Sequence, residues 1–166
     1  MSAEANKAVV RRFFEEVWSE GNRDAIRNLV HNDWLPGDPA LGHIRPRSGT
    51  SGIATFMTVY RGAFPDLTFT IEEQITEGEV VVTRFEARGT HSGEEVTVSF
   101  LGHRNFTIAP TGSLLTAHGV SVNRVVTAER DGSVVRKIKS NTWYWRTLGL
   151  LEALAVAQLR KQANTS

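Results

Sequence analysis

The spacing of apolar residues over the first third of the chain predicts three helices. Between residues 8 and 18, apolar side chains recur every three or four positions and Gly21 follows as a stop signal, which is typical of an amphipathic helix. Asn22 can cap a short second helix over residues 23–30, whose apolar side chains share one face. The same spacing predicts a third helix over residues 53–64.

Between the second and third helices, residues 31–52 contain too many prolines and glycines for either regular period. We therefore expect a loop there, and its length suggests a lid over a site. Asp38 and His43 lie in this segment and would reach a substrate only if the loop closed over it.

After residue 66 the apolar period changes from helical to the alternation of strands, with turns that contain glycine between the segments. Five strands are predicted, over residues 67–75, 79–91, 95–100, 114–126 and 133–143. Antiparallel pairing is the simplest arrangement for strands joined in this way. A final helix is predicted from the leucines of residues 148–159.

This order of elements predicts an α+β fold with a single domain over residues 1–166. We expect a cone-shaped α+β barrel in which a curved antiparallel sheet wraps around the N-terminal helices, followed by a C-terminal helix. A chain of this length buries about two-thirds of its unfolded surface. A bent sheet covered by helices can also enclose an apolar pocket, which is the usual location of a ligand.

The amino-acid composition limits the classes of binding partner that can be expected. The 19 Lys and Arg nearly balance the 18 Asp and Glu, so the net charge of +1 favours neither nucleic acid nor an anionic membrane as a partner. The chain has no cysteine, which excludes disulfides and thiol chemistry and fits a cytoplasmic location. No stretch resembles a signal peptide or the roughly 20 apolar residues of a membrane span. A small neutral partner is therefore expected.

Metal and cofactor motifs are not apparent in the sequence. The five histidines, at positions 31, 43, 91, 103 and 118, show no tight ligand spacing, so we predict no metal site. Phosphate loops, nucleotide fingerprints and Ser-His-Asp arrangements are not seen either, so we predict no cofactor.

Aromatic residues concentrate at two places. The segment "NTWYWRTLGLL", residues 141–151, joins the last predicted strand to the final helix and contains no carboxylate. The first and third helices carry aromatic stripes that are most simply core, at Phe13, Phe14, Trp18, Phe56 and Tyr60. In a fold with an interior cavity, core and cavity wall can be the same surface, so some of these side chains are candidates for ligand contact.

The charged face of one predicted strand is expected to point outward. Strand alternation places Arg84, Glu86 and Arg88 on one face and apolar residues on the other. The charged face is interpreted as an outer or dimer-facing surface. Glu86 would be a candidate base only if this face turned inward.

Several short motifs occur in a fixed order along residues 7–160: "FFEEVWSEGN", "AFPDL", "GTHSG", "PTG", "DG" and "LGLLEAL". With them the chain resembles the SnoaL-like polyketide cyclase family of the nuclear transport factor 2-like superfamily. The resemblance implies an α+β barrel whose cavity binds a polyketide. It also implies cofactor-free aldol ring closure, in which a cavity aspartate transfers the proton, although related proteins hydroxylate, isomerise steroids or open epoxides.

The chain departs from the family pattern at this aspartate. Alignment on "LGLL" places Arg146 there, and a few extra residues in the last hairpin would place Trp143 there instead. Arginine stays protonated and tryptophan offers only an N–H donor, so neither can accept the proton. The histidine that some cyclases use falls at Ser121, and His118 lies on the opposite strand face. The usual acid/base pair is therefore missing.

The resemblance and the residues together suggest a set of site residues. The candidate catalytic residues, which would contact substrate oxygens, are Arg146, Asn141 and Ser121. The candidate substrate-binding residues are Trp143, Trp145, Phe14, Tyr60, His91 and His118.

The predicted function is a polyketide tailoring or cyclase-like reaction on a hydrophobic substrate, without the usual aspartate. Three alternatives stay open: a hydroxylase-like protein, an aldol cyclase that uses Asp38 or Glu86 as its base, and a non-catalytic binding protein. A homodimer is expected, because one face of a large sheet would otherwise face water.

Overall fold

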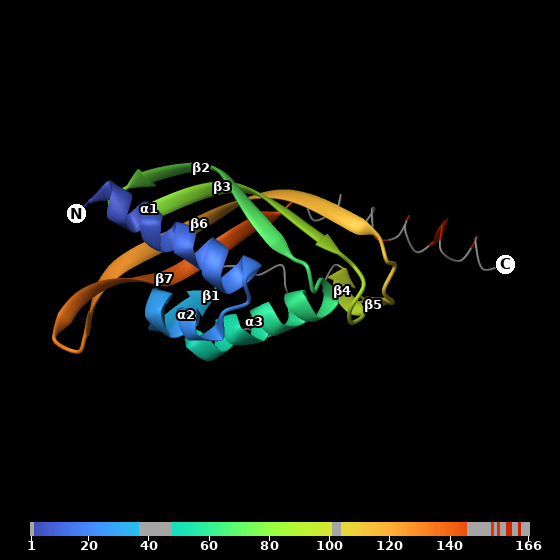
Figure 1. The fold of residues 1–166 in the computed structure, drawn as a ribbon, viewed down its shortest axis with the longest axis horizontal. Coiled ribbons are helices and arrows are strands. Elements are labelled where there is room, and N and C mark those ends of the chain that lie inside the picture. Colours follow the sequence, from blue (N-terminus) through green and yellow to red (C-terminus); the bar gives the residue numbers. More distant parts are fainter. Residues whose placement is uncertain are drawn as a thin grey trace.

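In the computed structural model the sheet curves around the N-terminal helices (Figure 1), and the predicted α+β fold is confirmed. The structure describes residues 2–36, 48–100 and 104–145, together with positions 154, 156, 159, 160 and 163. The predicted C-terminal helix lies mostly outside the described residues, although Leu154 is helical and buried.

The predicted helices are present, with one difference in the first. The helical elements are α1 (Ala3–Arg12), the π-helix η1 (Phe13–Ser19), α2 (Arg23–Leu29) and α3 (Thr50–Ala63). The first predicted helix therefore widens into a π-helix halfway along its length, a form that occurs frequently at functional sites. Asn22 caps α2 as predicted, because its Oδ1 accepts from the backbone N–H of Asp24 at 3.0 Å and of Ala25 at 3.2 Å.

The main sheet has the strand order β1-β7-β6-β3-β2, and its strands are β1 (Val30–Pro36), β2 (Thr68–Glu77), β3 (Val80–Thr90), β6 (Leu114–Arg130) and β7 (Ser133–Trp145). A separate two-stranded sheet contains β4 (Val96–Phe100) and β5 (Arg104–Ile108). The edge strands β1 and β2 do not pair with each other, so the sheet is open rather than a closed barrel.

Three details of the strands correct the sequence prediction. Strand β1 lies in the segment predicted to be a loop, and it pairs with β7 in parallel, so the sheet is mixed rather than antiparallel. Buried Val30 and Trp34 are separated by three polar residues, so the regular alternation of a strand is missing, and the neighbouring prolines and glycines favoured a loop. Strand β5 was also missed. The rest of the predicted loop, residues 37–47, lies outside the described residues.

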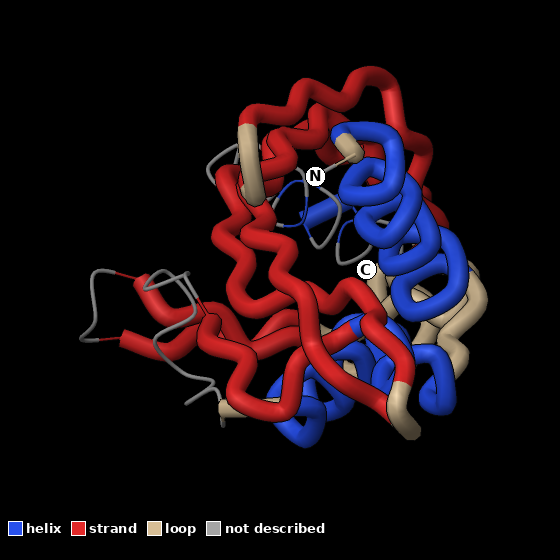
Figure 2. The backbone as a smooth tube through the Cα atoms, turned by 90° about the vertical axis from the view of Figure 1, so that its left-hand side faces the viewer, coloured by secondary structure: helices blue, strands red, loops and turns tan. Residues whose placement is uncertain are grey.

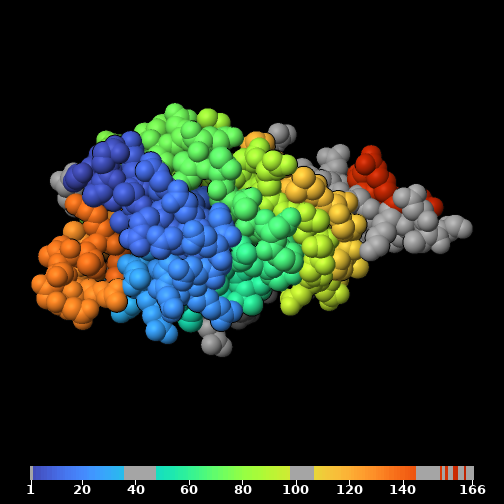
Figure 3. Space-filling model, in the orientation of Figure 1, coloured from blue at the N-terminus to red at the C-terminus, as the bar shows by residue number. Residues whose placement is uncertain are grey.

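The core lies between the helices and the concave face of the sheet. Figure 2 shows the strands curling around the helices, and in Figure 3 α1, α2, α3 and β2 pack closely on the visible face. Val10, Phe13 and Phe14 from the first helix are fully buried, as are Phe85 of β3 and Ile138 of β7. None of the described helices combines the length and the apolar character needed to cross a membrane.

Strand β2 has an irregular edge. Its pairing with β3 shifts register between Ile71 and Glu73, so Glu72 is an extra residue in the strand. The charges of Glu72 and Glu73 face Arg84 of β3, whose guanidinium nitrogens lie 2.5 and 3.4 Å from their carboxylates.

The end of η1 is held by Arg61 of α3. The guanidinium donates to the carbonyl oxygens of Trp18 at 3.0 Å, Ser19 at 2.7 Å, Leu67 at 3.1 Å and Pro65 at 3.0 Å. These contacts, in which the two N–H groups of Nη1 serve three carbonyls, join the π-helix to the turn that leads into β2. Those with Trp18 and Ser19 satisfy carbonyl groups that a helix end leaves open.

Two small residues complete this junction. The Ser19 hydroxyl donates to the Phe14 carbonyl at 3.1 Å and accepts from the Phe69 backbone N–H at 2.9 Å. At Gly21, φ is +71° and an added Cβ would lie 2.7 Å from Nε of Arg61, so a side chain there would disturb the clamp. The position of η1 against β2 is therefore fixed by the Arg61 guanidinium and by the hydrogen bond between Ser19 and Phe69.

Asp66 ties the same turn to the end of β3. Its carboxylate accepts from the Thr90 backbone N–H at 2.6 Å and from the Thr90 hydroxyl at 2.7 Å. The Thr90 hydroxyl bond, followed by the backbone bond, lowers the pKa of Asp66 below its usual value of 3.8. The stability from this pair is therefore present above about pH 4 and is lost as the pH falls through the lowered pKa.

We predict that Thr90→Val will slightly lower the free energy of unfolding at pH 7. The difference in this free energy between wild type and variant should become smaller as the pH falls below 3.8. Urea unfolding at pH 7 and at pH 3 measures both quantities. A gap of equal size at the two pH values would show that the carboxylate contributes nothing.

Candidate functional site

An aromatic cluster centred on Trp143 lines the concave face of the sheet. Its ring centroid lies 5.1 Å from that of Phe14, 5.2 Å from Phe85, 5.6 Å from Trp18 and 5.9 Å from Phe69. Phe14 and Phe85 are fully buried, whereas Trp143 and Phe69 keep part of their surface exposed. The cluster thus joins η1, β2, β3 and β7 in one wall that can pack against a planar apolar ligand.

The structure brings three of the predicted substrate-binding residues together. Phe14 and Trp143 are in direct ring contact, and Tyr60 of α3 joins them through Trp18 at 6.1 Å. The wide turn of η1 places Phe14 and Trp18 side by side on this wall. Their contact with a ligand stays a prediction.

Beside the cluster, a polar band crosses the buried sheet face. We use this name for Gln74 of β2, Thr83 of β3, Ser121 and Asn123 of β6, Asn141 of β7 and Trp34 of β1. Gln74 Nε2 donates to Thr83 Oγ1 at 3.3 Å, Asn123 Nδ2 donates to Ser121 Oγ at 2.7 Å, and Trp34 Nε1 donates to Asn141 Oδ1 at 3.0 Å. The register places Ser121 opposite both Thr83 and Trp143, and Asn123 opposite Asn141.

Three polar atoms of this region are buried without a hydrogen-bond partner among the described residues. They are Nδ2 of Asn141, Oδ1 of Asn123 and Nε1 of Trp18. This face therefore holds two unused donors and one unused acceptor among the described residues. Leaving each such group unpaired costs about 1–3 kcal/mol of folding free energy, so a ligand that pairs them gains binding energy. These groups can hydrogen-bond the oxygens and hydroxyls of a ligand.

The described part of the interior holds no carboxylate. Its buried polar and charged residues are Asn6, Thr83, His91, Ser121, Asn123, Lys137 and Asn141. Burial lowers the pKa of the Lys137 ammonium, which donates to the Arg27 carbonyl at 2.8 Å and is thus used in the fold. Amides and hydroxyls at this site can bind and orient a substrate, but they cannot remove a proton from carbon at neutral pH.

Glu86 and His118 lie on the outer face of the sheet. They are cross-strand neighbours there, with 3.8 Å between Glu86 Oε2 and His118 Nε2. The His118 side chain is 53% exposed, and its Nδ1 lies 3.7 Å from Glu72. His118 is therefore on the face opposite Ser121, as strand alternation predicts, and the inward turn that would make Glu86 a base does not occur.

His91 is a buried residue at the end of β3. Its ring packs against Phe64 with 5.2 Å between centroids, and its Nε2 lies 3.2 Å from the Glu94 carbonyl oxygen. Its backbone N–H donates to Ser113 and its carbonyl accepts from Gly112. These contacts describe a turn residue that fixes the loop after β3.

Other predicted residues lie outside the described residues: Arg146, Asp38, His43 and His103, with the side chain of Trp145. The backbone of Trp145 ends β7, beside the Trp143 cluster. Within the described ranges, no group of three or more His, Asp or Glu side chains is placed to hold a metal ion.

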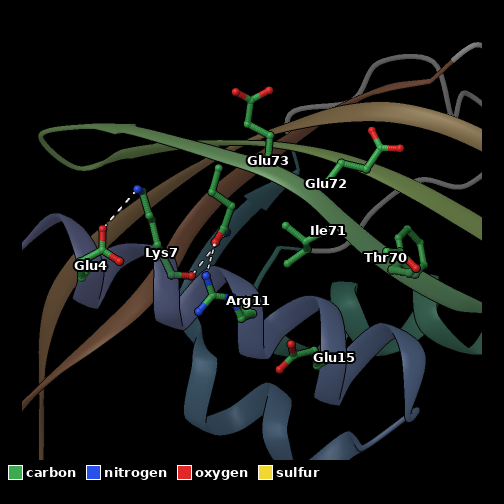
Figure 4. Close-up of a pocket in the computed structure, with 10 residues that line it drawn as sticks. Glu4, Lys7, Arg11, Glu15, Thr70, Ile71, Glu72 and Glu73 are labelled. Carbon is green, nitrogen blue, oxygen red and sulfur yellow. Dashed lines mark hydrogen bonds and ion pairs between the residues drawn. The ribbon is translucent and has the colours of Figure 1, made fainter.

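A surface pocket of about 500 Å³ lies between α1 and the edge strand β2 (Figure 4). Its walls carry Glu4, Lys7 and Arg11 of α1, with a 3.2 Å ion pair between Lys7 and Glu4. Such charged walls suit polar molecules better than an apolar ring. Phe69 also lines the pocket, so the pocket touches one edge of the aromatic cluster.

Sequence reasoning missed Asn123 and Trp34 as site residues. Asn123 lies two positions after Ser121, so strand alternation places both on one face, and this signal was available. Trp34 was in the segment predicted to be a loop. Trp18 was interpreted as core or cavity wall, and only the structure shows that its N–H has no partner among the described residues.

Comparison with known proteins gives one family. The model of the SnoaL-like polyketide cyclase family matches residues 8–154. No curated protein matches the chain.

Solved structures share the fold over almost the whole chain. A proposed SnoaL-like polyketide cyclase from Jannaschia sp. CCS1 is 21% identical with a TM-score of 0.67, covering 93% of this chain and 95% of the other. A proposed polyketide cyclase from Acidithiobacillus ferrooxidans is 23% identical with a TM-score of 0.69, covering 95% and 99%. AclR from Streptomyces galilaeus, a proposed hydroxylase, is 20% identical with a TM-score of 0.64, covering 93% and 98%.

Proposed function

Since the chain belongs to the SnoaL-like polyketide cyclase family, we propose that it acts on a hydrophobic polyketide intermediate held against the Trp143 cluster. One observation carries the proposal: the buried sheet face combines an aromatic wall with unpaired amide groups and, in its described part, no carboxylate. Such a face recognises flat rings with oxygen substituents. It favours a cyclase-like or tailoring reaction without the usual aspartate.

In this proposal the protein promotes ring closure through hydrogen bonds to oxygen. The NH₂ group of Asn141 and the hydroxyl of Ser121 donate to the oxygen of an enolate. A positive charge from Arg146, which is outside the described residues, stays a prediction from the sequence. A carbon between two carbonyl groups loses its proton to water, and the enolate carbon then forms a bond to a carbonyl carbon. The resulting alkoxide takes a proton from water, so the step needs no oxidant.

A carboxylate base is the main competing mechanism, and Glu86 and Asp38 were its candidates. We predict that Glu86→Gln will leave turnover of an enolisable polyketide within about twofold, because Glu86 is on the outer face. A pH–rate profile of wild type and variant checks this. Loss of an acid limb in the profile on Asp38→Asn would instead assign the proton transfer to Asp38 and contradict the proposal.

Two other functions are separated by what happens to the bound compound. The likeness to AclR supports a hydroxylase-like reaction, in which one atom of O2 enters the compound and an added two-electron reductant converts the other to water, so the product gains about 16 mass units, the mass of one oxygen atom. A binding protein would return the compound unchanged. Mass spectrometry of the compound after incubation distinguishes ring closure, hydroxylation and binding alone.

We also propose that the chain forms a homodimer through the outer sheet face. This face carries the exposed apolar side chains of Leu35, Leu114 and Tyr144 beside charged residues. Light scattering after size exclusion should give twice the chain mass of 18.4 kDa. A monomer mass at micromolar concentration would contradict this. The cytoplasmic location stays a prediction.

A further inference from the structure

We propose that Asn123 and Asn141 form a specificity-determining amide pair that recognises an uncharged ring edge with an adjacent hydrogen-bond donor and acceptor. The inference rests on the proposed ligand site and goes beyond it by assigning both residues a role in ligand choice. Asn123 was not among the predicted site residues.

The orientation of Asn141 is set by Trp34. An indole N–H can only donate, so the amide atom that lies 3.0 Å from Trp34 Nε1 must be the oxygen. This places the NH₂ group of Asn141 on the other side, where no described residue accepts from it. Asn141 therefore offers a donor in a fixed direction.

Asn123 offers the complementary group. Its NH₂ donates to Ser121 Oγ at 2.7 Å, which leaves its carbonyl oxygen without a partner among the described residues. Asn123 and Asn141 are directly opposite each other on the antiparallel strands β6 and β7. Side chains in such positions have Cβ atoms about 4.5–5.5 Å apart and point to the same face. One N–H donor and one C=O acceptor thus lie side by side.

Another buried asparagine, Asn6, provides a comparison with an amide whose role is structural. Asn6 is also fully buried, but its NH₂ donates to the Gly78 carbonyl at 2.9 Å and its oxygen accepts from Arg136 at 2.9 Å. Both of its amide groups are used. The Asn123 and Asn141 pair differs in leaving one group of each amide open.

The chemistry of the pair defines the class of ligand. A neutral ring with a C=O next to an N–H or O–H accepts from Asn141 and donates to Asn123 at once. A carboxylate is disfavoured, because it has no hydrogen to donate to the Asn123 oxygen. Trp143 is two residues from Asn141 on the same strand face, so a ring stacked on Trp143 directs its polar edge toward the pair.

Both open groups are fully buried, so neighbouring atoms must move before a ligand reaches the pair. Trp143 is the partly exposed aromatic side chain beside them on β7. Its fluorescence, taken as the difference between wild type and Trp143→Phe because the chain has four tryptophans, therefore provides a signal of ligand entry.

Three fused two-ring compounds of nearly equal shape test the proposal. 2-Quinolone has an adjacent N–H and C=O, coumarin replaces the N–H by a ring oxygen, and naphthalene has neither group. Wild type should bind 2-quinolone more tightly than coumarin, by about fivefold or more, the effect of one hydrogen bond. Equal affinities for these two compounds overturn the proposal without the use of any variant.

Variants then assign the preference to the two residues. Asn123→Leu should abolish the wild-type ratio of affinities between 2-quinolone and coumarin. Asn141→Leu should abolish the wild-type ratio of affinities between coumarin and naphthalene. Asn6→Leu, the same change at a buried amide away from the pair, should leave both ratios unchanged. If Asn123→Leu keeps the wild-type preference while folded by circular dichroism, the pair does not read the ligand.

The outcomes also separate this inference from the proposed function. If wild type binds all three compounds with affinities that follow only their apolar surface, the amide pair has no role and the aromatic site stands. If wild type binds none of them and Trp143 fluorescence does not change, the proposed ligand site is wrong, and the amide pair with it.

Discussion

Replacing Arg61 with alanine should lower the free energy of unfolding by about 3–4 kcal/mol, because it removes a charged donor that contacts four backbone carbonyls, three of them through the two N–H groups of Nη1. The loss of stability per bond is smaller than for a fully buried charged hydrogen bond, because water can donate to some of these carbonyl oxygens once the guanidinium is removed. Guanidinium unfolding followed by circular dichroism measures the change.

Arg23→Ala is the matched control for this experiment. The Arg23 guanidinium is exposed and donates to the Thr58 hydroxyl at 2.8 Å, so its loss should change stability by no more than about 0.5 kcal/mol. A loss below about 1 kcal/mol for Arg61→Ala would mean that η1 keeps its position without the clamp. The aromatic wall would then be set by packing alone.

Replacing Trp143 with alanine should weaken binding of a fused-ring ligand by about tenfold to a hundredfold, the range seen for a central aromatic anchor. The ring contacts Phe14, Trp18, Phe69 and Phe85, so its removal takes away the centre of the wall. Calorimetric titration with the polyketide or 2-quinolone, at a temperature where the variant stays folded, gives the change in Kd.

The neighbouring residue provides the control. Tyr144 is 62% exposed on the opposite face of the same strand, so Tyr144→Ala should leave affinity per chain unchanged whether or not it alters self-association. Trp143→Phe should restore part of the affinity, since a ring remains. If Tyr144→Ala weakens binding as much as Trp143→Ala, the ligand lies outside the concave face.

The sequence predicted those parts of the fold that depend on local pattern. Asn22 caps α2 as expected, because an amide side chain reaches the next backbone N–H groups in any fold. Strand β1 was missed because its parallel partner, β7, lies more than 100 residues away, and local turn residues gave the stronger signal. The π-helix was missed because buried residues at 13, 14, 17 and 18 suit both helical forms.

The site residues likewise include some that a local pattern predicts and others that depend on strand register. Aromatic stripes on the helices identified Phe14 and Tyr60, the aromatic segment 141–151 identified Trp143, and the structure places all three in one wall. The role of Asn123 depends on register, because a shift of one residue along β7 would remove Asn141 from the position opposite it. Nor can a sequence show which buried amide atom lacks a partner, since that depends on contacts such as the one with Trp34.

The irregular edge of β2 bears on how the molecule behaves at high concentration. An exposed regular edge strand can template the addition of strands from other molecules, which is a common start of aggregation. The extra residue Glu72 breaks the repeat along this edge, and a second carboxylate follows it immediately. Another chain approaching this edge would meet a kinked backbone and charged side chains, so the addition of strands to β2 is disfavoured.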